Sequence, residues 1–419
     1  MRQIMHIDAN SAYLSWTAVD LLERGYPVDV RTVPAAIAGN PGERRGIILT
    51  KSIPAKKRGV LTGESIRSAM QKCPDLLTFA PNYDLYMASS DALHDILSRY
   101  SDRIERYSVD ESWLDYTGSA AALGNVVSAA YEIKERIKRE LGFTVNVGVS
   151  VNKMLSKMAS ELKKPDMVHT LFPGEIPAKM WPLPVSELFY VGRATEKKLK
   201  GIGIETIGAL AAADPDVIRA VLKPVHGTLV WNYAHGIDDT PVANVSVLDQ
   251  KGVGNSTTTP FDVRDPEEAK LFMLALTERV AHRLRKLASY ARVVHVSIRR
   301  GDEGLTYAGR QRRLDRYIGT TDEIYDEAVR LLFSLWEGEP LRHFGVHVTE
   351  LMREDRLQTS VFDKDCAGRL ARIDAAVDRI RAVYGDRAVV RGAFVNSGIG
   401  AIQGGVNDGN YLLMGGHSL

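Results

Sequence analysis

Cysteine is almost missing from this chain of 419 residues, which has only Cys73 and Cys366. Two cysteines far apart in the sequence exclude a disulfide framework and a cysteine-ligated zinc site, and they fit a reducing compartment. Apolar runs of about 18 residues are also missing, so we expect no transmembrane helix. The first residues do not have the pattern of a signal peptide, so we expect a cytoplasmic protein.

Net charge is small as well, because 54 Lys and Arg residues against 52 Asp and Glu residues leave a formal charge of +2. The basic residues are unevenly distributed. Between Arg279 and Arg316 there are 11 basic and 3 acidic residues, an excess of 8. This segment favours a polyanionic partner such as nucleic acid, although a solvated helix face beside a strand edge explains it about equally well.

The chain is long enough for about two to four domains, and its hydrophobic periodicity predicts a mixed α+β order. Before residue 172 it predicts strands at 4–8, 28–37, 45–50, 107–116 and 144–150, and helices at 15–24, 62–72, 83–100, 120–141 and 152–162. A proline-rich linker is predicted at 173–184, then helices around a glycine turn, then a second linker at 241–254. Beyond it the pattern predicts helices at 265–288 and 321–336, strands at 292–300, 304–311 and 342–351, and a tail with a helix at 369–381.

Three carboxylates stand at the ends of predicted strands. Asp8 ends the first apolar run, and Asp110 and Glu111 are adjacent in the run 107–115. Because side chains alternate between the two faces of a strand, these two acids can share a site only where the strand ends or bends. Three carboxylates from two strands suit Mg²⁺, and two such ions suit an in-line phosphoryl transfer. For the adjacent pair alone, a solvated strand end is the plainer interpretation.

Basic residues accompany these acids in the sequence. Lys153 and Lys157 are four residues apart and share one helix face, and a basic loop is predicted at 51–59, with Lys51, Lys56, Lys57 and Arg58. Cationic side chains beside a carboxylate site suit a triphosphate, although each group is also compatible with an ordinary solvated surface. A helix, a glycine turn and a second helix near 190–204 offer backbone amides to phosphate groups.

Together these motifs resemble those of the Y-family DNA polymerases, the bacterial UmuC and DinB group of translesion enzymes. The resemblance rests on the segments 7–13, 108–115, 148–153 and 163–165, and it spans nearly the whole chain. It implies an α+β multidomain right hand with a ferredoxin-like palm, small fingers, a helical thumb with a helix-hairpin-helix, and an α+β little-finger domain. The tail leads us to expect the polymerase V-like, or UmuC-like, subgroup.

The resemblance also implies domain boundaries. We expect the palm at 1–14 and 82–171, the fingers at 15–81 and the thumb at 172–242, with its helix-hairpin-helix near 190–204. A linker at 243–253, a little finger at 254–352 and a tail at 353–419 would follow.

By this resemblance, Asp8, Asp110 and Glu111 bind two Mg²⁺ ions and the Ala9 carbonyl is a further ligand. Tyr13 takes the place of the steric gate, an aromatic ring that clashes with a ribose 2′-OH. Lys56 and Lys164 are expected to contact the triphosphate of the incoming dNTP. Many relatives have Tyr and Arg where this chain has Ile53 and Lys56, and because Lys cannot form a bidentate fork, we expect a different contact geometry.

Macromolecular partners follow from the same resemblance. Primer–template DNA is expected to contact Lys153, Lys157, Gly192, Gly201, Gly203, Arg299, Arg300, Arg310 and Arg312. The peptide 358–362 resembles the short motif with which bacterial polymerases bind the sliding clamp, through Gln358, Val361 and Phe362. We expect a monomer with no membrane partner.

The implied activity is template-directed, low-fidelity DNA synthesis across damaged templates, with release of pyrophosphate. Two other classes stay open. One is another palm-type enzyme, such as a nucleotide cyclase, and the glycine turn and basic segment argue against it. The other is a non-catalytic DNA-binding relative, and the intact Asp8, Asp110 and Glu111 argue against that.

Overall fold

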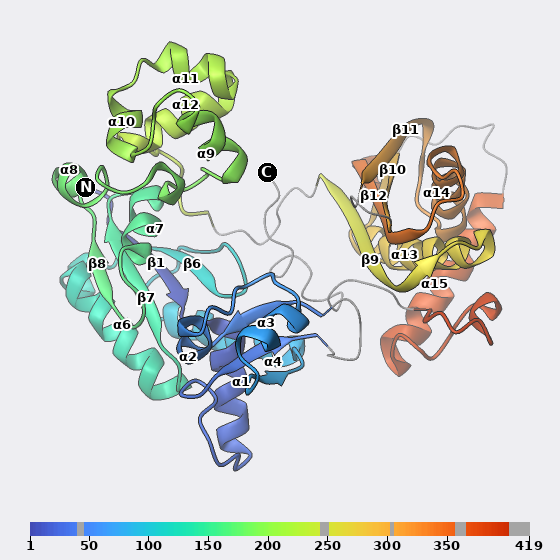
Figure 1. Cartoon of the computed structure of the whole chain (residues 1–419), viewed down its shortest axis with the longest axis horizontal. Helices are drawn as coiled ribbons and strands as arrows, with labels where there is room; N and C mark the ends of the chain where they lie inside the picture. Colours follow the sequence, from blue (N-terminus) through green and yellow to red (C-terminus); the bar gives the residue numbers. More distant parts are fainter. Residues whose placement is uncertain (40–45, 244–250, 302–305, 357–365, 402–419) are drawn as a thin grey trace. The chain divides into compact units, whose positions relative to one another are not determined.

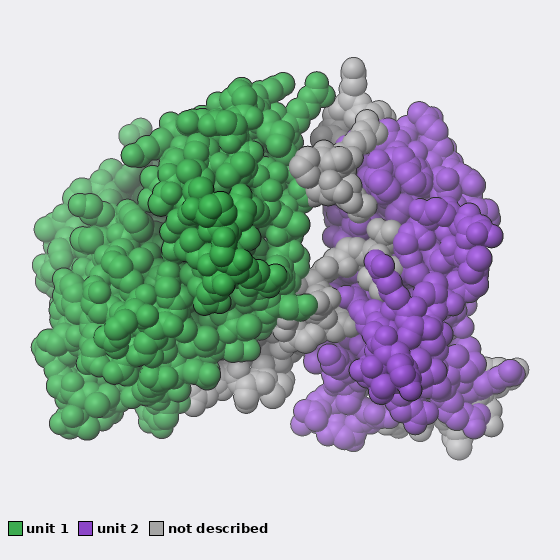
Figure 2. Space-filling view, turned by 90° about the horizontal axis from the view of Figure 1, so that it is seen from below, with its two compact units in different colours: residues 1–39, 47–246, 412–419 green, residues 40–46, 247–411 purple. Residues whose placement is uncertain are grey.

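A computed structural model describes residues 1–39, 46–243, 251–301, 306–356 and 366–401. The described residues form two compact units, one before position 244 and one from position 251 onward (Figure 2). Within these ranges, none of the helices has both the length and the apolar character needed to cross a membrane.

The first unit is built on a five-stranded sheet with the order β5-β6-β1-β7-β8 (Figure 1). Its strands are β1 (Ile4–Ala9), β5 (Ile104–Arg106), β6 (Glu111–Asp115), β7 (Val145–Ser150) and β8 (Val168–Thr170). β1 lies in the middle, antiparallel to β6 and β7, and every residue of β1 and β7 is buried. Met5 and Ile7 of β1 pack on one face, in the same core as α4 (Tyr83–Leu97) and α6 (Val126–Leu141).

The opposite face of β1 is covered by α7 (Lys153–Glu161). Ser160 of this helix contacts the buried His6 ring, which projects from the face opposite Met5 and Ile7. The helix approaches closely because β7 has a glycine there: a Cβ on Gly148 would stand 1.9 Å from the Ser156 carbonyl oxygen and 2.4 Å from the Ser160 nitrogen. Gly148 therefore sets the distance between α7 and the sheet.

A smaller sheet with the order β3-β2-β4 lies beside helices α1 (Ala12–Glu23), α2 (Ile53–Lys57) and α3 (Ile66–Lys72). Its strands are β2 (Ala35–Ala38), β3 (Ile48–Lys51) and β4 (Leu77–Phe79), so the strands predicted at 28–37 and 45–50 are shorter than expected. The prediction of a loop at 51–59 is wrong, because the Ser52 hydroxyl accepts the Ala55 amide and begins α2.

The last part of the first unit is helical, with η1 (Pro173–Glu175), α8 (Ile176–Lys179), η2 (Val185–Glu187), α9 (Arg193–Lys200), α10 (Ile207–Ala212), α11 (Pro215–Leu222) and α12 (Pro224–Ala234). The predicted linker at 173–184 is folded instead. Its Ile176 and Met180 are buried in one core with α9 to α12. Pro173 and Pro177 occupy the first turns of short helices, where no amide is needed.

The second unit contains a four-stranded antiparallel sheet with the order β11-β10-β12-β9. Its strands are β9 (Gly252–Val263), β10 (Ser289–Arg300), β11 (Tyr307–Ile318) and β12 (Leu341–Arg353), and α13 (Pro266–Lys286) and α14 (Thr321–Leu335) share its core. β9 overlaps the predicted second linker. It escaped prediction because Asn255, Thr257 and Thr259 occupy inward positions where apolar residues are expected.

The helix predicted at 369–381 within the tail is present, and the described part of the tail is folded. The helix α15 (Cys366–Tyr384) packs on the second unit, and Phe394 and Ile399 lie in its core. The contact is rich in charge. Asp374 accepts the Thr321 backbone amide at the start of α14, and Asp378 binds the ring of His282 and the guanidinium of Arg285.

Replacing Gly148 by alanine should move α7 and destabilise the first unit, because the new methyl group would overlap the helix backbone. We expect a loss of about 1–3 kcal/mol in the free energy of unfolding, measured by urea denaturation. Gly118→Ala is the control, since a Cβ there meets nothing within 4 Å. Equal stability of the two variants would contradict the packing.

Replacing Asp378 by asparagine should weaken the α15 contact. Burial alone would raise the pKa of Asp378, but the hydrogen bonds from His282 and Arg285 lower it below its ordinary value of 3.8. A lowered pKa stabilises the fold above the unfolded-state value, and this contribution is lost as the pH falls through the folded-state value. Thermal unfolding should therefore separate Asp378→Asn from the wild type at pH 7, and the difference should shrink below about pH 4. The exposed Asp326→Asn is the control, and a pH-independent difference would refute this account.

Candidate active site

Asp8 and Glu111 lie side by side where two central strands meet. Asp8 is near the end of β1 and Glu111 begins β6, and the antiparallel register pairs these two residues directly. Asp110 immediately precedes β6, and its carbonyl accepts the Ala9 amide at 3.0 Å. The chain bends at Asp110, as the sequence required for two adjacent acids to reach one site.

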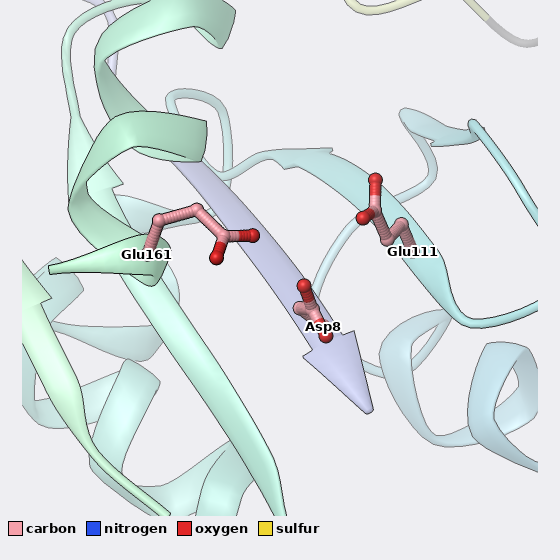
Figure 3. Close-up of side chains that lie close together, drawn as sticks. All are labelled: Asp8, Glu111 and Glu161. Atoms are coloured by element: carbon pink, nitrogen blue, oxygen red, sulfur yellow. The ribbon is translucent and has the colours of Figure 1, made fainter. Parts of the chain in front are cut away.

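A third carboxylate, which the sequence did not predict, points at this pair. Oxygens of Asp8, Glu111 and Glu161 lie within 4.8 Å of one another, and Figure 3 shows the three side chains converging from β1, β6 and α7. Their oxygens are suitable ligands for a hard divalent cation. Glu161 was missed because it belongs to a Lys- and Ser-rich helix, although its spacing of four from Lys157 places both residues on one helix face.

Lysines compensate the charge of these acids. The Lys164 ammonium lies 2.8 Å from an Asp8 oxygen and 2.9 Å from a Glu161 oxygen. The Lys157 ammonium lies 2.6 Å from Oε2 of Glu111. Two lysines that were predicted to serve nucleotide or DNA thus contact the metal-ligand candidates directly.

The pKa values of the three predicted acids are shifted in different directions. Burial raises the pKa of Asp8, and the Lys164 charge offsets only part of that shift. Burial also raises the pKa of Asp110, against a hydrogen bond from the Ser108 hydroxyl. For Glu111 burial is outweighed by contacts with His6 and Lys157, which lower its pKa to about 2. Glu111 is therefore a carboxylate at neutral pH, while a proton or a cation stabilises the other two.

Tyr13, the predicted steric gate, is held by a cluster of aromatic rings. Its ring stacks on that of Tyr86 with centroids 4.4 Å apart and planes 9° apart, and the Tyr83 ring meets its edge at 6.3 Å. Burial and the nearby Asp110 raise the pKa of Tyr13 to about 12, so the phenol is neutral. The Tyr13 ring is therefore neutral and held in place, and its role as a steric gate stays a prediction.

Lys56 lies on α2 with an exposed side chain, near Lys51, whose pKa is lowered by burial and by the Lys56 charge. Lys153 is instead half-buried: its ammonium lies 2.6 Å from Glu105 and 4.5 Å from the Trp113 ring centroid. The proposed nucleotide and DNA contacts of these lysines stay predictions.

The remaining residues predicted to contact DNA lie in two places, around α9 in the first unit and on β10 and β11 in the second unit. Gly192 and Gly201 flank α9, and Gly203 adopts a φ of +82° in the turn toward α10, which agrees with the predicted helix, glycine turn and second helix. In the second unit Arg299 and Arg300 end β10, while Arg310 and Arg312 lie on β11. Arg300 pairs with Glu339 and Arg312 with Glu327. The predicted clamp contacts, Gln358, Val361 and Phe362, lie outside the described residues.

Replacing Lys164 by methionine should leave Asp8 buried beside Glu161 without its ammonium partner. We expect the metal-free variant to lose about 1–2 kcal/mol of unfolding free energy at pH 8, because Lys164 is partly exposed. Since the pKa of Asp8 is already raised, the loss should be smaller at pH 5, where this acid is more often protonated. Urea denaturation in EDTA at both pH values tests this. Lys163→Met is the control, and an equal loss in that variant would refute the pairing.

Comparison with known protein families identifies three segments. Residues 7–161 match the impB/mucB/samB family, residues 173–204 match the IMS family HHH motif, and residues 250–361 match the impB/mucB/samB family C-terminal domain. The first match contains all the acids of the site, and the second contains α9 and the glycines Gly201 and Gly203 that follow it.

Among curated relatives, DNA polymerase IV of Clostridium acetobutylicum is 42% identical over 388 residues, covering 93% of this chain and 97% of that protein. DNA polymerase IV of Acetivibrio thermocellus is 38% identical, with 93% and 97% covered. These names do not support the expected UmuC-like subgroup.

Solved structures share the fold. A chimera of the Y-family DNA polymerases Dbh and Dpo4 aligns with a TM-score of 0.71 at 22% identity, covering 84% of this chain and 99% of that one. DinB from Sulfolobus solfataricus aligns with a TM-score of 0.52. The expected right-hand fold class is confirmed, and the chain belongs to the Y family of DNA polymerases, the impB/mucB/samB family.

Proposed function

We propose that this chain is a template-directed, low-fidelity DNA polymerase for translesion synthesis. The observation that supports this most is the register pairing of Asp8 with Glu111, beside Asp110, in a chain 42% identical to a DNA polymerase IV over nearly its whole length. The names of the relatives favour the DNA polymerase IV, or DinB-type, group over the UmuC-like group for this chain.

Asp8, Asp110 and Glu111, with the Ala9 carbonyl, are the proposed ligands of two Mg²⁺ ions. The site fits such ions because its donors are carboxylate oxygens that already converge within 4.8 Å for Asp8, Glu111 and Glu161. When bound, the ions lower the pKa of the primer 3′-OH and neutralise the triphosphate during the in-line displacement of pyrophosphate.

The protein's own residues prepare this site. Lys157 keeps Glu111 ionised, and Lys164 compensates Asp8 and Glu161 while no substrate is present. Lys164 is the proposed first phosphate contact, and its ammonium would move from the acids to the phosphates when a triphosphate binds. Lys56 is the proposed second phosphate contact, as a point charge rather than a fork.

DNA and the sliding clamp are the proposed macromolecular partners of a monomeric enzyme. The turn from Gly201 to Gly203 would contact the DNA backbone through amides. The palm, finger, thumb and little-finger boundaries at 1–14 with 82–171, 15–81, 172–242 and 254–352 remain our assignment. So do the DNA contacts of the arginines on β10 and β11 and the clamp contact of the 358–362 peptide.

Primer extension with dNTPs and Mg²⁺ tests the activity. The wild type should extend an undamaged primer, and Asp110→Asn should lose about 10³-fold or more, because a metal ligand contributes several kcal/mol to the transition state. Asp95→Asn, an exposed acid on α4, is the control. Extension by Asp110→Asn at the wild-type rate would refute the site. DNA binding without extension in the wild type would instead indicate a non-catalytic relative.

Tyr13→Ala tests the gate. Removing the ring should let a ribose 2′-OH enter, so the ratio of dNTP to rNTP incorporation should fall by about tenfold or more, equivalent to ~1.4 kcal/mol. Single-nucleotide incorporation measures this ratio, and the exposed Tyr131→Ala is the control. An unchanged ratio would refute the assignment of Tyr13.

A further inference from the structure

His6 is a fully buried histidine beneath the acid site that the proposed mechanism does not use. It lies on β1, two residues before Asp8 and therefore on the same face of the strand. Its Nε2 atom is buried and has no hydrogen-bond partner among the described residues. Oε2 of Glu111 lies 3.6 Å from this Nε2 atom. A buried polar atom without a partner costs free energy, so its retention calls for an explanation.

The ring has little freedom to turn away from Glu111. Its Nδ1 lies 2.8 Å from the Ser160 hydroxyl, and its plane packs against Trp113 with centroids 5.1 Å apart. The Trp113 ring is itself held by a hydrogen bond from its Nε1 to the Lys153 carbonyl. Both contacts depend on α7, so the packing at Gly148 also fixes the imidazole.

The hydrogen bonds of Ser160 select one tautomer. The Ser160 hydroxyl has one proton and two acceptors in reach, the Lys157 carbonyl and Nδ1 of His6, both at 2.8 Å. The Lys157 carbonyl lies four residues before Glu161 within α7, so a helix amide already satisfies it. When the Ser160 hydroxyl donates to Nδ1, both the hydroxyl proton and Nδ1 have a partner. The imidazole proton is then on Nε2, directed at Glu111. The opposite choice would aim the Nε2 lone pair at a carboxylate.

Glu111 receives both of its contacts on one oxygen. Lys157 and His6 approach Oε2, while Oε1 has no hydrogen bond from any described residue. Donors on Oε2 leave Oε1 available to a cation, which is how partners of metal-ligand carboxylates usually act.

We infer that His6 is a positioning residue whose Nε2–H orients Glu111 for cation binding, with its tautomer set by Ser160. This inference rests on the proposed role of Glu111 as a metal ligand. The 3.6 Å separation would close to a hydrogen bond when the site is loaded, since such contacts tighten in the working complex.

The test uses Mn²⁺ binding to the full chain, measured by electron paramagnetic resonance, together with the Mg²⁺ dependence of primer extension. His6→Asn retains a group near Nδ1 but removes the donor toward Glu111, whereas His6→Gln places an amide near Nε2. We expect His6→Asn to weaken Mn²⁺ binding by about tenfold or more and His6→Gln to retain most of the affinity. Excess Mg²⁺ should restore much of the extension rate of His6→Asn.

His94→Asn is the matched control, because His94 also has a buried ring nitrogen without a partner but lies on α4 among Arg106, Asp91 and Asp95. If His6→Asn fails to fold, the Mn²⁺ affinity of Ser160→Ala is compared with that of Ser156→Ala instead. Both serine hydroxyls lie within hydrogen-bond distance of the carbonyl three residues earlier, but Ser160 alone of the two contacts His6. Only Ser160→Ala should weaken Mn²⁺ binding.

Glu111→Gln separates this inference from the proposed function. If Glu111→Gln loses Mn²⁺ binding while His6→Asn or Ser160→Ala binds like the wild type, the positioning role is refuted and the metal site stands. If Glu111→Gln itself binds and extends like the wild type, the assignment of the ligand is refuted, and the role of His6 with it.

Discussion

The close packing of α7 on the central sheet is the constraint on which the acid site depends. A backbone contact possible only at Gly148 brings the helix down onto β1 and β7. That approach places Lys157 beside Glu111, Ser160 against His6 and Glu161 opposite Asp8. Because protein interiors are close-packed, a change of one methyl group at this point would be felt at every one of these contacts.

Charge balance in the site follows from that packing. Carboxylates that are close together and removed from water repel one another. The ammonium groups of Lys157, on α7, and Lys164, just after α7, offset this repulsion. The lysines thus stabilise the group of acids. The site nevertheless holds Asp8 and Asp110 in an environment that raises the pKa of both.

The second unit shows the same dependence on buried charge in a structural role. Glu278 of α13 binds Arg381 and Arg391, and Asp374 caps α14, so α15 is joined to the sheet domain by ion pairs as well as by Phe394 and Ile399. Partly buried ion pairs of this kind require good geometry to offset the loss of hydration. They explain why a segment with the composition of a polar tail is folded.

The sequence motifs identified the family and, through that resemblance, the fold class. The sequence also placed Asp8, Asp110 and Glu111 at strand ends, because alternation along a strand and the position of a strand end are local properties. Local signals failed where polar side chains occupy the core, as in β9, and where a single cap begins a helix, as at Ser52. Only the tertiary structure decided that Glu161 joins the acids, that Lys153 and Lys157 face acids, and that His6 lies beneath Glu111. Each of those contacts joins residues at least 46 positions apart in the sequence. The register of β1 with β6 and the approach of α7 at Gly148 bring them together, and no local pattern encodes either one.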